Sequence, residues 1–272
     1  MRCSKWLRIA PFDGLPLAHS SGIDTGLDGS DSTGKGDGMA TAIIGIGRIG
    51  GHLARHLVAG GERVIVAARD EVKAAEFAKQ LGKLASAASV GSAIAQADIV
   101  VFAVWFDTIK KLIAVNASLL EGKIVVDPSN PLKPDGNGGL ARTLPEDRSA
   151  GEVIARLLPP RARYVKAFSG HTAQTLGAGA GRSPDRVAVF YATDNKKAAR
   201  TIERLISTAG FDPVKAGGVK ESIRIEAGGD LHEYGGLKGK VLNGSEARSA
   251  AAHGAGATHR RERLELFQTP ED

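Results

Sequence analysis

The sequence predicts a doubly wound α/β fold on a parallel sheet, and three observations predict it. A short apolar run at residues 42–44 leads into Gly45-x-Gly47-x-x-Gly50, and a helical pattern follows at once. A second apolar run arrives at residues 64–67, where a βαβ unit needs its next strand. Buried-strand and amphipathic-helix patterns then keep alternating, as parallel strands with crossover helices require. Together these features indicate a sheet of the Rossmann type.

Glycines and apolar spacing set the expected elements of the first half. A helix at residues 49–59 places Leu53 and Leu57 on one face and ends at Gly60. The run at residues 99–104 is apolar throughout, so we expect a strand buried on both faces. The other elements expected here are strands at 64–67, 84–88 and 123–127 and helices at 71–81, 90–96 and from residue 107 onward.

We divide the chain into four parts. Residues 39–148 are the expected Rossmann domain, and residues 149–242 are expected to form a smaller mixed α/β domain for the substrate. Residues 1–38 include a polar, glycine-rich run, so we expect a disordered extension, with Met39 as a candidate true start. Residues 243–272 are poor in large apolar side chains and are expected to form a disordered tail. Within these parts we expect helices at 149–158 and 195–209 and strands at 163–168, 186–192 and 211–214. Residues 259–267 of the tail have a helical pattern, but we do not expect such a helix to pack firmly.

Composition limits the classes of function. The net charge is +6 with 5% aromatic residues, and no basic stripe is interleaved with aromatic side chains, so we expect no nucleic-acid partner. The single cysteine, Cys3, excludes an internal disulfide, and no metal site is indicated. No apolar run approaches the roughly 20 residues that cross a bilayer, and the N-terminus lacks the pattern of a signal peptide. We therefore expect a cytoplasmic enzyme with no membrane partner.

The glycine turn predicts a bound dinucleotide. Gly45 permits the tight turn, Gly47 lets the backbone approach a pyrophosphate, and Gly50 lets the helix pack close to the strand. The free N–H groups and the dipole of the following helix then face the phosphates. The alternative is a glycine turn kept only for packing of helix against strand. We assign the whole turn to the cofactor, which adds Ile46, Arg48 and Ile49 to the three glycines.

The end of the second expected strand indicates NADP(H) rather than NAD(H). Arg69 follows Ala68 where an adenosine 2′-phosphate would lie, and its guanidinium can grip that phosphate through paired hydrogen bonds. Lys73, four residues on, and Arg48 in the glycine turn can add positive charge. In the alternative, Arg69 and Lys73 are solvated surface charges and Asp70 is a helix cap. Asp70 could also be the carboxylate that holds the ribose of NAD.

Five segments together carry a resemblance to one family. They are GIGRIGG in the glycine turn, Ala68-Arg69-Asp70 with Lys73, ADIVVFAV at 97–104, VVDPSNP at 125–131 and YVKAF at 164–168. Over roughly residues 40–231 the chain resembles the NADPH-dependent coenzyme F420 reductases, also called F420-dependent NADP oxidoreductases. The resemblance implies NADP(H) across the glycine turn. It also implies a deazaflavin, coenzyme F420, stacked on the nicotinamide as the hydride acceptor.

The chain departs from this family most on the acceptor side. Ala68 stands where the family normally has serine, so one contact to the 2′-phosphate is missing while Arg69 is retained. Trp105 stands where the family commonly has proline, and Ser169 where it usually has asparagine. The family also has many members whose acceptor is not a deazaflavin. The cofactor half is therefore matched better than the acceptor half.

The hydride-transfer site is expected outside the carboxyl ends of the strands. Transfer needs the nicotinamide and the acceptor carbon face to face at roughly 3–3.5 Å. We place the nicotinamide against Val104, Asn130 and Ala167, with the side chain of Asn130 as the polar contact of the carboxamide. The alternative role of Asn130 is turn formation. The candidate catalytic residues are Asn130, Ser169 and His171.

Each acceptor-side candidate also has a structural alternative. His171 can donate a proton or a hydrogen bond to the acceptor, or be a capping or surface group. Ser169 can bind the acceptor, although capping of the following helix is favoured. Lys166 can bind an anion, although a packed stem with a solvated amine is slightly favoured. Trp105 can stack on the acceptor ring or fill the core, and His232 is expected to be exposed.

The resulting hypothesis is an NADP(H)-dependent oxidoreductase that transfers a hydride between NADPH and coenzyme F420 or a flavin-like acceptor. We expect a homodimer whose other partner is the small-molecule acceptor. One alternative is a reductase of a small carbonyl or imine compound. The strands expected at 186–192 and 211–214 argue against the all-helical second domain of the β-hydroxyacid dehydrogenases and imine reductases. Another alternative is a non-catalytic NADP-binding sensor.

Overall fold

Eight strands of the described chain form one sheet, and six neighbouring strands run parallel. The structure is a computed structural model that describes residues 39–253. The order across the sheet is β10-β9-β8-β5-β4-β1-β2-β3. From β3 to β8 every pair is parallel, β8 and β9 are antiparallel, and β9 and β10 are parallel. The strands are β1 (Thr41–Ile44), β2 (Val64–Ala67), β3 (Ala85–Ala87), β4 (Ile99–Phe102), β5 (Ile124–Asp127), β8 (Arg163–Ala167), β9 (Ala188–Ala192) and β10 (Asp212–Gly217).

The six parallel strands have the order of a dinucleotide-binding sheet. β2 and β3 lie on one side of β1, and β4, β5 and β8 lie on the other. Thr41 pairs with both Val64 and Ile99, so β1, β2 and β4 begin level with one another. The direction of winding reverses between β1 and β4, and ligands of such sheets bind at this point, outside the carboxyl ends of the strands. The predicted fold class is confirmed.

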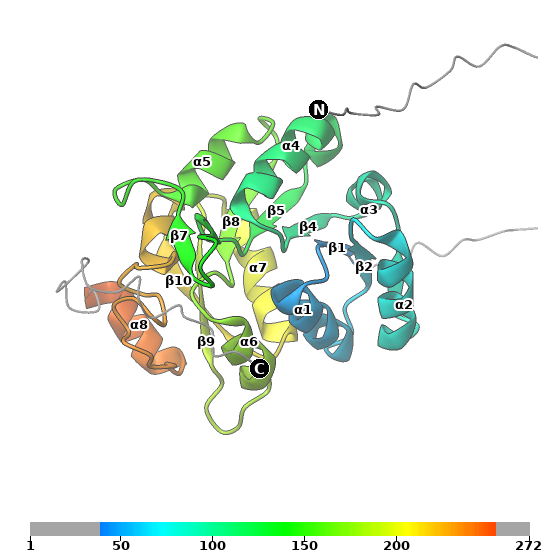
Figure 1. Cartoon of the computed structure of the whole chain (residues 1–272). Helices are drawn as coiled ribbons and strands as arrows, with labels where there is room; N and C mark the ends of the chain where they lie inside the picture. The colour runs from blue at the N-terminus through cyan, green and yellow to red at the C-terminus, as the bar shows by residue number, and fades with distance from the viewer. Residues whose placement is uncertain (1–38, 254–272) are drawn as a thin grey trace, which may run out of the picture. The chain divides into compact units, whose positions relative to one another are not determined.

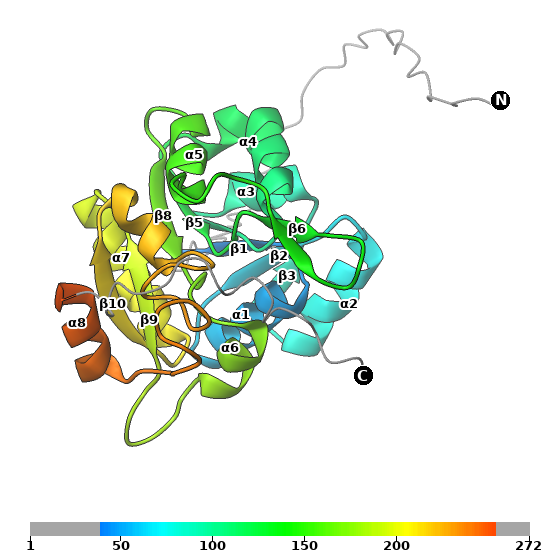
Figure 2. The same cartoon turned by 60° about the vertical axis from the view of Figure 1, so that its left-hand side comes forward.

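Helices cover both faces of the sheet (Figure 1). One hydrophobic cluster joins α1, α2, α6 and α7 to one face, and a second joins α3, α4 and α5 to the other. Figure 2 shows α4 and α5 on one side of the strands and α1 and α6 on the other. Within residues 39–253, no helix is long and apolar enough to cross a membrane. The helices are α1 (Arg48–Ala59), α2 (Glu71–Leu81), α3 (Val90–Gln96), α4 (Phe106–Leu120), α5 (Ala150–Leu157), α6 (Ala173–Gly179), α7 (Lys196–Thr208) and α8 (Gly244–His253), with a 3-10 helix η1 (Val219–Ile225).

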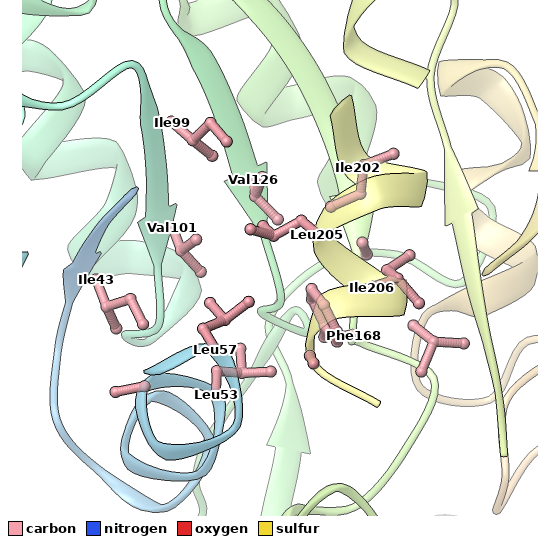
Figure 3. Packing of buried hydrophobic residues seen from close by; sticks show 14 of the residues in the cluster. Ile43, Leu53, Leu57, Ile99, Val101, Val126, Phe168, Ile202, Leu205 and Ile206 are labelled. Atoms are coloured by element: carbon pink, nitrogen blue, oxygen red, sulfur yellow. The ribbon is translucent and has the colours of Figure 1, made fainter. Parts of the chain in front are cut away.

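The cluster beneath α1 and α7 anchors the ends of the central strands. Leu53 and Leu57 of α1, predicted from their spacing, are buried, and Leu205 of α7 approaches the same interior from the other side (Figure 3). Burial of each such side chain contributes roughly 1.5–3 kcal/mol. Phe168, which follows β8, belongs to this cluster as well. Packing in this cluster therefore holds in place the strand ends that carry the candidate site.

The sheet continues across residue 148, where we predicted a boundary between two domains. β8 lies after that boundary, yet it is the sixth strand of the parallel order. β9 and β10, which were expected in a separate small domain, extend the same sheet. Residues 39–253 accordingly lie within one unit. An antiparallel hairpin of β6 (Leu132–Pro134) and β7 (Leu140–Arg142) projects between β5 and α5 in the chain order.

The predicted disordered tail is wrong for its first eleven residues, 243–253. Asn243 accepts hydrogen bonds from the N–H groups of Ser245 and Glu246, which starts α8. Ala247 of this helix is fully buried in a third cluster, against β9 and β10. Small side chains allow that close packing, which a search for large apolar residues misses. The expected extension at 1–38 and the expected helix at 259–267 lie outside the described residues.

Candidate functional site

Five loops follow the carboxyl ends of β1, β2, β4, β5 and β8. Because these strands are parallel neighbours in one sheet, their loops meet at one edge. The predicted site residues belong to these loops, to the first turns of α1 and α2, or to the last residue of β8. In the part of the chain that the structure describes, no group of three or more His, Cys, Asp or Glu residues is placed to hold a metal ion. The loops are 45–47, 68–70, 103–105, 128–131 and 168–172.

Two glycines of the turn after β1 are required by the protein itself. Gly45 has a φ of +100°, and a Cβ there would lie 2.5 Å from the carbonyl oxygen of Ala103. A Cβ on Gly50 would lie 1.9 Å from the carbonyl oxygen of Gly45. The turn therefore closes against the end of β4 and lets α1 start directly above it. Both predicted packing roles are met by this geometry.

Gly47 is different, because the protein does not need a glycine there. A Cβ on Gly47 would meet no protein atom within 4 Å, and its φ of −67° suits any residue. Gly47 is the N-cap of α1 but supplies no side-chain hydrogen bond, so the first N–H groups of the helix have no side-chain cap. Gly47 and Arg48 are exposed, and Ile46 and Ile49 are half-buried. An exposed helix N-terminus with bare N–H groups fits the phosphates of a dinucleotide.

The loop after β2 separates Arg69 from Asp70. The carboxylate of Asp70 accepts a hydrogen bond of 3.1 Å from the N–H of Lys73 and caps α2. That hydrogen bond from Lys73 lowers the pKa of Asp70. The ammonium of Lys73 lies 3.6 Å from the same carboxylate. Asp70 is thus engaged as the helix cap, which is the alternative foreseen for it, and this argues against a role in binding ribose.

Arg69 and Arg48 are cations without a partner in the described part of the chain. Both are exposed, and neither forms a hydrogen bond or ion pair with another of the residues 39–253. Ala68, between β2 and Arg69, is half-buried. The side chain of Lys73 is 74% exposed, so its ion pair with Asp70 leaves the ammonium accessible. These groups fit a phosphate on the adenosine ribose by charge.

The loop after β4 brings an aromatic side chain to the same edge. The strand ends at Phe102, two residues earlier than predicted, because Ala103 and Val104 turn against the glycine loop. The Cγ1 of Val104 would lie 2.6 Å from a Cβ on Gly45. Trp105, the N-cap of α4, is 52% exposed. Of the two roles foreseen for Trp105, core filling is therefore wrong, and the ring is open to a ligand.

A buried ion pair lies beneath the loops after β5 and β8. The ammonium of Lys166 donates to Oδ2 of Asp127 over 2.9 Å and to the carbonyl of Ser129 over 2.6 Å, and Lys166 and Asp127 are fully buried. The hydroxyl of Tyr164 donates to the same Oδ2 over 2.7 Å. Burial, together with Asp127, raises the pKa of Tyr164 well above its usual value. Both roles predicted for Lys166, an anion site or a solvated amine, are wrong.

Asn130 joins three segments through its side-chain amide. Its Nδ2 donates to the carbonyl of Ser169 over 3.0 Å, and its Oδ1 accepts from the N–H of Ala227 over 2.7 Å. The residue is half-buried, and one amide hydrogen is left beyond these two bonds. These bonds tie the loop to two distant segments, a role that neither prediction for Asn130 included. Ala167 is fully buried in β8, so it supports the site from below and cannot contact a ligand directly.

Ser169 and His171 are held in the interior. The hydroxyl of Ser169 donates to the carbonyl of Ile225 over 3.0 Å, and Thr172, not Ser169, caps α6. The ring of His171 lies 3.1 Å from Glu233 through Nδ1 and 2.8 Å from the carbonyl of Ala188 through Nε2. Because both ring nitrogens face oxygen acceptors, no ring nitrogen remains for a substrate. The predicted catalytic roles of these two residues therefore find no support in the geometry.

The segment after η1 supplies polar contacts that the sequence analysis did not predict. Glu233 accepts hydrogen bonds from His171, the N–H of Thr172 and the hydroxyl of Thr175. Burial raises the pKa of Glu233, but these hydrogen bonds outweigh it and the net pKa is lowered. His232, predicted to be exposed, is 3% exposed, and burial lowers its pKa to about 4. The expected exposure of His232 is therefore wrong.

Phe168 has a backbone conformation that side chains rarely adopt. Its φ is +64°, and its ring is 1% exposed within the main cluster. A bulky residue in the left-handed region is held there by its surroundings. Here the packed ring fixes one side, and the bonds of Ser169 to Asn130 and Ile225 fix the next residue. Strain of this kind is common where loops surround a ligand.

Comparison with known families finds a similarity for the first part of the described chain. A family model described as NADP oxidoreductase, coenzyme F420-dependent, matches residues 40–131. Residues 40–131 are therefore similar to that family. The match includes the glycine turn, Arg69, Val104 and Asn130, and it ends before the loop at 168–172. The match supports an NADP-binding role for residues 40–131, and of the five loops at the site only 168–172 lies outside the matched residues.

Individual proteins are also similar to this chain. Metalloreductase STEAP3 of Rattus norvegicus is 28% identical over 212 residues, 78% of this chain but only 40% of that protein. The chain thus spans about two fifths of the length of that relative. Hypothetical protein SMa0349 of Sinorhizobium meliloti is 28% identical with a TM-score of 0.66, over 75% of this chain and 95% of that one. A protein named as an F420-dependent NADP-reductase from Arthrobacter sp. FB24 is 25% identical with a TM-score of 0.60, over 68% and 88%.

More distant structures share the fold alone. An imine reductase from Pseudomonas sp. is 20% identical, with a TM-score of 0.52 over 68% of this chain and 57% of that chain. The imine reductase extends well beyond the shared part. In this chain the corresponding second half is occupied by β9 and β10, which continue the sheet. The expectation that strands here exclude a purely helical second half agrees with that topology.

Proposed function

We propose that this protein transfers a hydride between NADPH and a planar acceptor of the deazaflavin or flavin type, with coenzyme F420 as the first candidate. The observation that carries the proposal is the exposed ring of Trp105 directly after Val104, whose side chain closes against the glycine turn. An aromatic ring at this position can stack on a flat conjugated acceptor beside the nicotinamide. The resemblance to the F420-dependent family and the Arthrobacter protein's name support the same acceptor.

Each part of the predicted cofactor site has a distinct role in this proposal. Gly47 leaves room for the pyrophosphate, and the N–H groups at the start of α1 bind its oxygens. Arg69 binds the 2′-phosphate, and Arg48 and Lys73 add charge around it. Val104 and the loop at 128–131 border the nicotinamide, and the remaining amide hydrogen of Asn130 is a candidate contact of its carboxamide. Ala167 and Phe168 support this loop from below.

Hydride transfer to a conjugated ring suits a site without a dedicated protein acid. NADPH supplies the hydride when it is bound. A flavin-like or deazaflavin ring spreads the negative charge that it gains, and solvent can supply the proton that completes its reduction. The residues of the chain then need only to bind, orient and exclude water. Reduction of a simple carbonyl would call on a positioned acid, and the two candidates for it, Ser169 and His171, are already bonded to Ile225, Glu233 and Ala188.

An assay of NADPH oxidation tests this proposal directly. Coenzyme F420, FMN, riboflavin and a panel of small carbonyl and imine compounds are offered in turn, with NADH in parallel. We expect NADPH-selective turnover with the deazaflavin or with a flavin. Turnover confined to the carbonyl or imine panel would overturn the acceptor class. Tight NADPH binding without turnover of any acceptor would favour the sensor alternative. The homodimer and the cytoplasmic location expected from the sequence stay predictions.

A further inference from the structure

Ser129 is held at the carboxyl end of β5 by two buried charged groups. Its N–H donates to Oδ1 of Asp127 over 2.8 Å, and its carbonyl accepts from the ammonium of Lys166 over 2.6 Å. Both backbone groups of Ser129 are therefore satisfied and fixed in direction. Pro128 precedes it, and Asn130, whose amide is bonded to Ser169 and Ala227, follows it. The backbone of this loop is thus fixed on both sides of Ser129.

Of the polar groups of Ser129, only the side-chain hydroxyl lacks a hydrogen-bond partner in the described part of the protein. Its hydroxyl is buried, and it forms no hydrogen bond with any of the residues 39–253. A buried hydroxyl without a partner is unfavourable, and such groups in native structures usually have a partner in a bound molecule or in water. Rotation about χ1 moves the hydroxyl between staggered positions while the fixed backbone stays in place.

The place of Ser129 in the sheet indicates which part of a bound dinucleotide would lie near its hydroxyl. β5 is the neighbour of β4, whose end carries Val104 against the glycine turn. We infer that the hydroxyl of Ser129 binds the carboxamide of the nicotinamide. A hydroxyl both donates and accepts, and a carboxamide offers an oxygen acceptor and an N–H donor. This inference rests on the cofactor site of the proposed function and not on the identity of the hydride acceptor.

A second unpaired hydroxyl provides a matched control. Ser222 is fully buried and its hydroxyl also lacks a partner among the described residues. It lies in η1, where a Cβ on Gly151 of α5 would be 2.5 Å from its Oγ, so it is enclosed between these two helices. It does not follow the carboxyl end of a strand. Ser129→Ala and Ser222→Ala therefore make the same chemical change in and out of the proposed site.

Binding and thermal melting of the whole chain test the inference together. The dissociation constant is measured for NADP⁺ and for adenosine 2′,5′-bisphosphate, which lacks the nicotinamide. For Ser129→Ala we expect affinity for NADP⁺ to fall about three- to tenfold, the effect of one lost hydrogen bond, and affinity for the bisphosphate to stay unchanged. The Tm without ligand should stay or rise, because no internal bond is lost. Ser129→Thr should retain the affinity for NADP⁺, and Ser222→Ala should bind both ligands normally.

Other outcomes overturn the inference. Equal weakening of both ligands by Ser129→Ala would mean that the serine acts through the shape of the loop. An unchanged affinity for NADP⁺, with or without a lower Tm, would assign the hydroxyl no ligand. If the wild-type chain bound no NADP⁺, the cofactor site itself would be refuted. If it bound NADP⁺ but reduced no deazaflavin or flavin, only the proposed acceptor would fail, and the Ser129 variants would still decide the inference.

Discussion

The ammonium of Lys166 lies 2.9 Å from Oδ2 of Asp127, and neither side chain is exposed. The two residues are register partners on β5 and β8. The pair joins two neighbouring strands where they end, directly below the loop that holds Ser129 and Asn130. A buried pair of this kind fixes geometry, and removal of one partner leaves the other charge without compensation.

Lys166→Met is therefore expected to destabilise the protein by about 3–5 kcal/mol, because Asp127 would keep a buried and unpaired charge. Urea unfolding at pH 7 measures the change. Lys73→Met is the matched control, since it removes the same group from the exposed pair with Asp70 and should not change the unfolding midpoint measurably. The double change Lys166→Met with Asp127→Asn should recover part of the loss. Equal midpoints for Lys166→Met and Lys73→Met would contradict this account.

Gly47→Ala should separate binding from folding. The added Cβ meets no protein atom within 4 Å, so the free energy of unfolding should change by less than about 1 kcal/mol. The same Cβ would occupy space proposed for the pyrophosphate, so affinities for NADPH and NADH should fall together by about tenfold or more. Fluorescence titration and melting curves report the two effects. Gly50→Ala, with its Cβ 1.9 Å from the carbonyl of Gly45, should instead lower the Tm sharply. Normal cofactor affinity in Gly47→Ala would argue against the pyrophosphate site.

Arg69→Glu should remove the preference for the 2′-phosphate. We expect NADPH affinity to fall by about 10- to 100-fold, the effect of a lost charge-assisted hydrogen bond, and NADH affinity to change little. Arg63→Glu is the control, because Arg63 is also exposed but precedes β2, at the opposite edge of the sheet. It makes the same change in net charge. If Arg69→Glu lowered the affinities for NADPH and NADH equally, Arg69 would not be the residue that binds the 2′-phosphate.

Trp105→Ala tests the acceptor side. The ring is 52% exposed, so the Tm should change little, while kcat/KM for the preferred planar acceptor should fall by about tenfold through the lost stacking. The KM for NADPH should not change. Val115→Ala on the same helix removes a side chain that is 84% exposed and far along the helix from the strand end, and should leave both parameters alone. A wild-type kcat/KM in Trp105→Ala would place the acceptor elsewhere.

His232 should make the fold sensitive to mild acid. Burial first, and then His171, lower its pKa from 6.5 to about 4, while Glu233 acts in the opposite direction. The folded state therefore prefers the neutral ring. Stability should be full above pH 6.5, decline as the unfolded chain takes up a proton below it, and stop declining from this cause near pH 4. A shift of this size corresponds to about 3 kcal/mol.

His232→Asn provides the comparison for that decline. The N–H of Tyr234 donates to Nδ1 of His232, and the asparagine oxygen can accept in its place. Urea unfolding at several values between pH 8 and pH 4 should show a shallower loss of stability in the variant than in the wild type, above all between pH 6.5 and pH 5. Parallel curves for the two proteins would show that other groups cause the acid sensitivity.

The elements of this fold that local sequence predicts are those with local causes. The N–H of Lys73 binds Asp70, and the N–H of Glu152 binds Ser149, so the two helices start where their caps stand. The apolar run of β4 can only be buried on both faces. The glycine turn, with the strand before it and the helix after it, predicts both the fold and the dinucleotide. In each case the interacting groups are within a few residues of one another.

The acceptor side depends on groups that lie far apart in the chain. Lys166 is buried because Asp127 stands beside it on the next strand, and His171 is occupied because Glu233, 62 residues later, folds over it. Charge and polarity along the chain predicted solvent for Lys166 and His232, because a single sequence does not show which residues become neighbours. The sequence by itself determined the fold class, the parallel strands β1, β2, β4 and β5, and the glycine turn. Only the tertiary structure decided which polar side chains are bonded to one another and which, like Arg69 and the hydroxyl of Ser129, have no partner among residues 39–253. The physical reason is that hydrogen bonds and ion pairs between distant segments form only after the chain has folded.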